Sequence, residues 1–297
     1  SSDVCSSDLL LLQGGLCVFT MLNPRKFYRA VGHKKFLDFF VLTVFLLFFY
    51  GPLTNLFMLA FAEIYQYPNL IPQKFGFKWW EFVLSQKTMM SAVGQSFMFA
   101  IVTTVFSLLI CLPAAYGLAR YKFPGRRLVM FSFMLSNAFP KIGLYTSIGI
   151  MYYKLNLMGT FLGVVLIHMI NTMMFMVWIP CGAFSSVHRQ QEEAARDAGA
   201  GPFLTFCKVT LPMAVPGIAV ACIYTFLGSM DEAQGTLLVV VPQYQTMPVM
   251  MYTVISDYNV MAAAVYALAM VISTIVLLSL LRRYVGPEAI SSGFQMK

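Results

Sequence analysis

The chain has 297 residues, of which 59% are hydrophobic and only 11% are charged, and its mean hydropathy is +0.74. These values are too apolar for a water-soluble domain of this length and indicate an integral membrane protein. The net charge of +8 does not indicate a nucleic-acid partner, because the basic residues are scattered between apolar runs. The six cysteines include no CxxC pair and no His/Cys cluster with zinc spacing, so we expect no disulfide framework and no metal site.

The two ends of the sequence differ from its apolar middle. Ser1 to Leu9 read SSDVCSSDL, which resembles the in-frame translation of a sequencing-library adapter, so we interpret residues 1–20 as an artefact or a mis-called start. Met21, just before a basic stretch, is then the expected first residue. The remaining chain divides into a basic segment, first span and outer loop over 21–90, a core of five spans over 91–284, and a tail over 285–297.

Long apolar runs predict the architecture. A helix that crosses the hydrocarbon needs about 20 mostly apolar residues. Such runs predict six transmembrane helices, at 36–62, 91–119, 128–151, 158–183, 212–230 and 260–281. The expected fold is therefore all-α and polytopic. The sequence has no GxxxxGK[ST] phosphate loop, so we expect a membrane subunit that has no ATPase site of its own. A membrane-bound enzyme would need clustered His, Asp, Cys or Ser partners at membrane depth, which the sequence does not show, so we expect no enzyme.

Lysine and arginine predict the orientation of the spans, because positively charged short loops stay in the cytoplasm. Basic residues gather before the first span, in the connections 120–127 and 184–211, and at the start of the tail. The alternate connections, at 63–90, 152–157 and 231–259, have a lower net positive charge. Both termini are therefore predicted in the cytoplasm, with Trp79 and Trp80 at the outer membrane interface.

The connection over 185–212 has a pattern of its own. Gln191 to Pro212 read QEEAARDAGAGPFLTFCKVTLP. Glu192 and Arg196 have the i,i+4 spacing of an ion pair on a short helix, and Gly199 can take the left-handed conformation that ends it. Pro202 suits the first position of a second helix. An ordinary cytoplasmic loop with a helical turn would share these features, so they define no function by themselves.

The full spacing of this loop resembles the EAA loop of ABC importer permeases, EAA-x3-G-x9-[IV]-x-LP. Two further segments, Leu112 to Arg127 and Lys154 to Leu166, are similar to the second-span exit and the fourth-span entry of that family. The family's proline shortly before the EAA helix is absent, since Val187 and His188 stand in its place. The positions that match the loop motif are Glu193, Ala194, Ala195, Gly199, Val209, Leu211 and Pro212.

The resemblance implies a type I ABC importer permease in a bacterial plasma (inner) membrane. In that family the loop is a coupling helix that docks on a cytoplasmic ATPase subunit. ATP would be bound by that partner, so we expect no cofactor in this chain. A second permease subunit and an extracytoplasmic solute-binding protein complete the expected assembly, which also contacts membrane lipid and no nucleic acid.

Polar residues inside the predicted spans are the candidates for a solute pathway, because an ionisable group near the bilayer centre costs roughly 2.5–3.5 kcal/mol on insertion scales. Lys141, which follows Asn137 and Pro140 in the third predicted span, either lines a polar cavity or is a lysine that snorkels or pairs across helices. His168 and Asn171 in the fourth predicted span either share that cavity or form interhelical hydrogen bonds, which is the more common role.

These motifs do not determine the solute. The overall layout is most similar to maltose-type carbohydrate permeases, whereas Ser229 to Tyr252 also resemble polyamine permeases. Asp231 and Glu232 in this segment are expected near the outer end of the fifth span. We favour a sugar over a polyamine or another small solute. An ion-coupled secondary transporter is a further alternative, but it would not need an EAA loop.

Overall fold

The computed structural model describes residues 33–285 except 241 and 258. The predicted artefact at 1–20 and the tail from residue 286 lie outside this part of the chain. Residues up to Phe57 and residues from Met58 onward form two units, and each is described by itself. Helix α3 (His33–Ala60) carries the first predicted span, and its stretch Leu37–Ala60 is long and apolar enough to cross a membrane.

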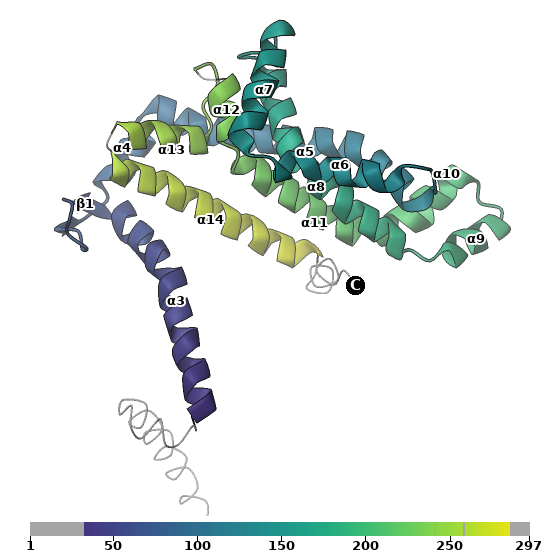
Figure 1. Cartoon of the computed structure of the whole chain (residues 1–297), viewed down its shortest axis with the longest axis horizontal. Helices are drawn as coiled ribbons and strands as arrows, with labels where there is room; N and C mark the ends of the chain where they lie inside the picture. Colours follow the sequence, from purple (N-terminus) through teal and green to yellow (C-terminus); the bar gives the residue numbers. More distant parts are fainter. Residues whose placement is uncertain (1–32, 241, 258, 286–297) are drawn as a thin grey trace, which may run out of the picture. The chain divides into compact units, whose positions relative to one another are not determined.

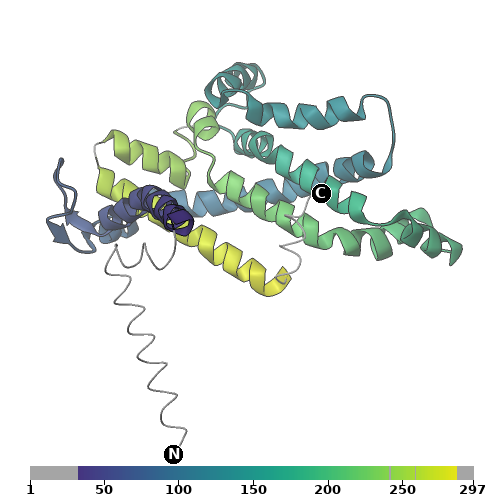
Figure 2. The ribbon, with the colours of Figure 1, turned by 60° about the horizontal axis from the view of Figure 1, so that its bottom comes forward.

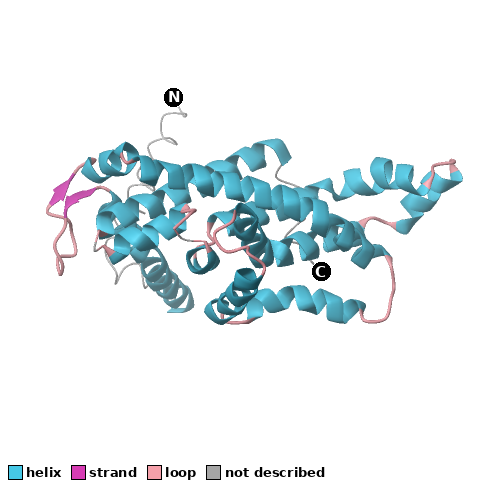
Figure 3. Cartoon of the chain, turned by 90° about the horizontal axis from the view of Figure 1, so that it is seen from above, coloured by secondary structure: helices cyan, strands magenta, loops and turns pink. Residues whose placement is uncertain are grey.

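A short β-hairpin follows α3 in the outer connection predicted from the sequence. Strand β1 (Ala62–Ile64) pairs antiparallel with β2 (Lys74–Phe75), and these are the only strands among the described residues (Figure 3). An ion pair of 2.6 Å joins Lys74 to Glu63 across the hairpin. Helix α4 (Lys78–Ser85) follows and carries Trp79 and Trp80.

Three long helices form the centre of the unit that begins at Met58. They are α5 (Lys87–Arg120), α8 (Phe161–Ser186) and α11 (Leu211–Met230), which pack side by side (Figures 1 and 2). Small residues line their contacts: Ala115 and Ala221 are fully buried, and a Cβ added to Gly217 would lie 2.5 Å from the Cβ of Ala183. Close approach through small residues is typical of membrane helices, which lack a hydrophobic driving force between them.

The third predicted span, 128–151, is not one continuous helix. The chain forms α6 (Arg126–Ala138) and α7 (Lys141–Lys154), which are bent by 103° relative to each other (Figure 2). Pro140 explains the break, because proline has no N–H to donate and disfavours the helical conformation in the residue before it. Phe139 accordingly has φ −82° and ψ 150°. Lys141 is thus the first residue of α7 and does not lie in the middle of a helix.

The fifth span begins earlier than the predicted 212–230. One helical segment runs over Pro202–Met230 and comprises α10 (Pro202–Thr205), a π-helical turn (Phe206–Thr210) and α11. Leu211 and Pro212 are therefore the first residues of α11 and continue a helical segment that is already under way. Pro212 is tolerated close to the π-helical turn, where the regular backbone hydrogen-bond ladder is already interrupted.

Two short helices, α12 (Gln234–Val239) and α13 (Met247–Ser256), precede the last helix, α14 (Val260–Val285). Helix α13 packs along α14, and Met250 and Tyr266 belong to their shared buried cluster. The described residues contain five helices that are long and apolar enough to cross a membrane, and the bent pair α6–α7 is a candidate sixth span. The predicted all-α, polytopic fold is thereby confirmed.

Candidate functional site

The loop after α8 folds into two helices joined by a tight turn, at one end of the helix assembly (Figure 1). Helix α9 (Arg189–Asp197) ends before Gly199, whose φ of +89° is left-handed. The N–H of Gly199 donates to the carbonyl of Arg196 (2.9 Å), and the N–H of Ala200 donates to the carbonyl of Ala195 (3.0 Å). These two hydrogen bonds define a Schellman motif, which fixes the direction of α10 relative to α9.

Glu192 fastens α9 to the two helices beside it. Its Oε1 accepts hydrogen bonds from Nη2 of Arg120, the last residue of α5, and from the hydroxyl of Thr210, just before α11, both at 2.6 Å. Nη1 of Arg120 also donates to the carbonyl of Val187, and Nη2 of Arg189 donates to the carbonyl of Arg120. The Arg120 and Glu192 side chains are each only 10% exposed. One shielded carboxylate therefore holds α9 to both α5 and α11.

The predicted ion pair between Glu192 and Arg196 is wrong, because Glu192 turns inward and pairs with Arg120. A shielded carboxylate needs charged or polar partners that replace its lost hydration, and an exposed neighbour on the same helix cannot supply them. The sequence contained one signal of this role. Glu192 and Glu193 are adjacent and so point about 100° apart on a helix, which directs one of them towards the rest of the chain.

The residues that match the EAA motif differ in their exposure. The exposed ones are Glu193, Ala194, Gly199 and Pro212, and the half-buried ones are Ala195, Val209 and Leu211. A Cβ at Gly199 would meet nothing within 4 Å, so only the backbone conformation requires glycine there. The exposed part of α9 thus presents the Glu193 carboxylate beside the small side chain of Ala194, where a partner surface can approach closely.

A second group of polar side chains lies where α8 meets α11 and α12. The buried His168 of α8 has its Nδ1 2.7 Å from the Ser229 hydroxyl and its Nε2 2.9 Å from the Thr236 hydroxyl. Asn171 donates to the carbonyl of Gly228 at 3.1 Å. Both side chains therefore form interhelical hydrogen bonds, which satisfy polar groups where lipid offers no partner.

The break between α6 and α7 carries the other two pathway candidates. Asn137, near the end of α6, is exposed and donates to the carbonyl of Asn171 at 3.3 Å. Lys141 is also exposed, and its charge interacts with those of Asp231 and Glu232. Asn137 and Asn171 are thus in contact, and of the four candidates only Asn137 and Lys141 present exposed side chains.

Glu232 is a further buried carboxylate, positioned just after α11. Its Oε2 accepts a hydrogen bond from the Tyr145 hydroxyl of α7, and its Oε1 accepts one from the N–H of Gly235 in α12, both at 2.8 Å. It is 2% exposed, and burial raises the pKa of its carboxyl group. Glu232 therefore ties α7 to α12 and is committed to bonds within the chain. The described residues hold no group of three or more His, Cys, Asp or Glu suited to a metal ion.

Comparison with known proteins identifies the family and the fold of the chain. Residues 107–289 match the family described as binding-protein-dependent transport system inner membrane component. The spermidine/putrescine transport system permease protein PotC of Escherichia coli (strain K12) is 26% identical over 67% of this chain and 77% of its own length. The trehalose transport system permease protein SugB of Mycobacterium tuberculosis is 29% identical over 55% of this chain and 60% of its own length.

A solved structure shares the fold. It is a bacterial ABC transporter involved in the import of the acidic polysaccharide alginate, with a TM-score of 0.65 and 19% identity over 84% of this chain and 95% of that chain. The family match covers more than half of the sequence, so this chain belongs to the inner-membrane components of binding-protein-dependent transport systems. It is a transmembrane permease subunit of an ABC importer of small solutes.

The role of Glu192 as an anchor can be tested by removing its carboxylate. Glu192→Ala leaves the shielded Arg120 without its ionic partner, which costs about 3 kcal/mol. We expect amides of α9 to exchange hydrogen about 100-fold faster as this helix opens locally. Hydrogen–deuterium exchange of the purified protein measures the effect. Glu193→Ala removes the adjacent, exposed carboxylate and should leave exchange unchanged; equal protection in both variants would contradict the anchor.

Proposed function

We propose that this chain forms part of the pathway of a bacterial sugar importer, and that α9 is the helix through which an ATPase subunit drives it. The observation that carries this proposal is the bonding of Glu192 to both Arg120 and Thr210. These bonds link an exposed helix directly to the ends of α5 and α11. A displacement of α9 is thereby passed to two of the three central helices.

The assembly proposed for this chain has three kinds of partner. A cytoplasmic ATPase binds ATP and receives Glu193, Ala194 and Ala195 of α9, with Gly199 setting the angle of the turn. A second permease subunit, identical or different, completes the pathway, and an extracytoplasmic solute-binding protein delivers the solute. Val209, in the π-helical turn, and Leu211 and Pro212, at the start of α11, form the stem that follows the docking helix.

The orientation proposed for the chain places α9 and the 120–127 connection in the cytoplasm. The β1–β2 hairpin lies at the opposite end of the central helices from α9 (Figure 1), which supports an external position for the hairpin. With the basic residues that flank the first and last spans retained inside, both termini are cytoplasmic.

Coupling can be separated from membrane insertion by changing the turn and the exposed carboxylate. Gly199→Val places a β-branched side chain at a φ of +89°, which costs at least about 1–2 kcal/mol, and Glu193→Lys reverses the charge offered to the partner. We expect both variants to insert normally but to lose ATPase co-purification or solute-stimulated ATP hydrolysis. Gly199→Ala should have a milder effect.

Gly201 supplies the matched control for this experiment. It lies two residues further along, has an ordinary φ of −65° and also has open space at its Cβ, so Gly201→Ala should preserve coupling. The proposal fails if Gly199→Val and Glu193→Lys both retain the ATPase complex and wild-type transport. It also fails if Gly201→Ala is as damaging as Gly199→Ala.

A sugar is the solute class that the exposed charges favour. Lys141 is an exposed cation close to the carboxylates of Asp231 and Glu232, and Glu232 is already bonded within the chain. A polycationic solute would be repelled by Lys141, and the exposed Asp231 is the nearby carboxylate left to attract it. The trehalose-system relative supports a sugar, and the spermidine/putrescine-system relative keeps a polyamine as the second candidate.

The proposed pathway at the α6–α7 break predicts a transport defect in Lys141→Met. This variant removes an exposed charge and keeps a side chain of similar length, so uptake should fall at least severalfold while assembly and basal ATP hydrolysis persist. Lys154→Met, at the other end of α7, is the control and should transport normally. Uptake of radiolabelled sugars and of spermidine by cells measures both the transport defect and the solute class. Normal uptake by Lys141→Met contradicts the pathway role, and uptake of spermidine alone contradicts the sugar.

A further inference from the structure

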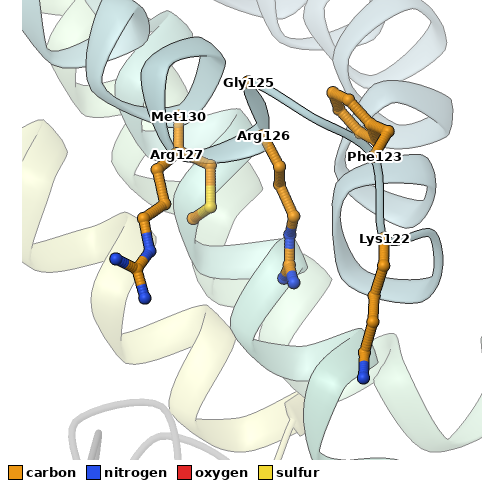
Figure 4. A pocket seen from close by; sticks show the side chains of 6 residues that line it. All are labelled: Lys122, Phe123, Gly125, Arg126, Arg127 and Met130. Carbon is orange, nitrogen blue, oxygen red and sulfur yellow. The ribbon is translucent and has the colours of Figure 1, made fainter.

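The connection between α5 and α6 forms a basic cavity of about 540 Å³. Its lining includes the side chains of Lys122, Arg126 and Arg127 and contains no carboxylate (Figure 4). The three cationic side chains extend in the same direction from the turn that carries them (Figure 4). None of them forms a salt bridge with another described residue. Three positive charges therefore line a space large enough for a ligand group.

The positive charge at the start of α6 is unusual for the N-terminus of a helix. The N-terminus of a helix carries a partial positive charge and favours acidic side chains in its first turn. Helix α6 begins instead with Arg126 and Arg127, and its N-cap residue, Gly125, provides no side-chain acceptor. The Nε of Arg126 is shielded from solvent and has no hydrogen-bond partner among the described residues. An external anion on the open side of this cluster would relieve the repulsion.

The surroundings of the cavity distinguish a lipid from a soluble anion. Leu128 is 76% exposed and Phe131 is 59% exposed, so α6 presents large apolar side chains within two turns of the cationic cluster. Such side chains suit acyl chains, and the cations suit the phosphate above them. A lipid has the same arrangement, with a charged head group next to its hydrocarbon chains. Basic pockets between transmembrane helices bind anionic head groups in this way.

We propose that Lys122, Arg126 and Arg127 bind the phosphate head group of an anionic phospholipid from the cytoplasmic leaflet. Arg127 and Lys122 are exposed and bind the phosphate from the open side of the cavity. The half-buried Arg126 adds its positive charge from the inner side. The bound head group neutralises the start of α6. The bound head group also stabilises the connection between α5 and α6. Arg120 is the last residue of α5, and α6 leads to the break at Pro140.

The test compares lipids that differ only in head-group charge. The full chain is purified in detergent and titrated with short-chain phosphatidylglycerol, with phosphatidylcholine of the same chain length, and with inorganic phosphate. We expect phosphatidylglycerol to bind at least tenfold more tightly than phosphatidylcholine. The double variant Lys122→Gln/Arg127→Gln should weaken phosphatidylglycerol binding at least tenfold, because each basic residue near an anionic surface contributes roughly fivefold.

Two control variants make the result specific. Lys122→Arg/Arg127→Lys keeps both charges and should retain the lipid preference. Lys87→Gln removes one exposed charge at the opposite end of α5 and should bind like the unchanged protein. Equal binding of the two lipids, or an unchanged affinity in the double glutamine variant, overturns the proposal. Binding of inorganic phosphate that displaces phosphatidylglycerol at comparable affinity also overturns it, because the site would then hold a soluble anion.

Discussion

The shielded carboxylate of Glu192 is the interaction on which the proposed coupling depends. It accepts from Arg120 and Thr210, and the same arginine also donates to the carbonyl of Val187. Helix α9 has only nine residues, too few for a helix to be stable in water by itself. Its position therefore comes from these bonds and from the Schellman turn at Gly199. With the stem held inward, Glu193 and Ala194 remain exposed for a partner.

Lipid imposes the second constraint, since every polar group within the hydrocarbon must find its partner inside the protein. His168 and Asn171 meet this requirement through hydrogen bonds to Ser229, Thr236 and Gly228. The break at Pro140 frees backbone groups, and such a break at membrane depth is tolerated where it lines a cavity or is buried in protein. This supports the proposed pathway near the exposed Asn137 and Lys141, behind which the bonded His168 and Asn171 would form a packed wall.

Much of the fold could be predicted from local pattern, because length and hydropathy define spans without reference to distant residues. Gly199 and Pro202 likewise predicted where one helix ends and where the next begins. The break in 128–151 was missed since a hydropathy run continues through Pro140 even though the helix does not. The partner of Glu192 was missed for a different reason: Arg120 lies 72 residues earlier in the sequence, and only the tertiary packing of α5 against α8 and α11 brings it near.

In-cell photo-crosslinking from α9 tests the central claim most directly. A photoreactive amino acid replaces Ala194 on the exposed face of α9, and another replaces Leu70, which is 86% exposed in the β1–β2 hairpin. The account predicts an adduct between position 194 and the cytoplasmic ATPase subunit, and none from position 70. A transport-competent complex in which position 194 forms no ATPase adduct, or in which position 70 forms it instead, would contradict the account.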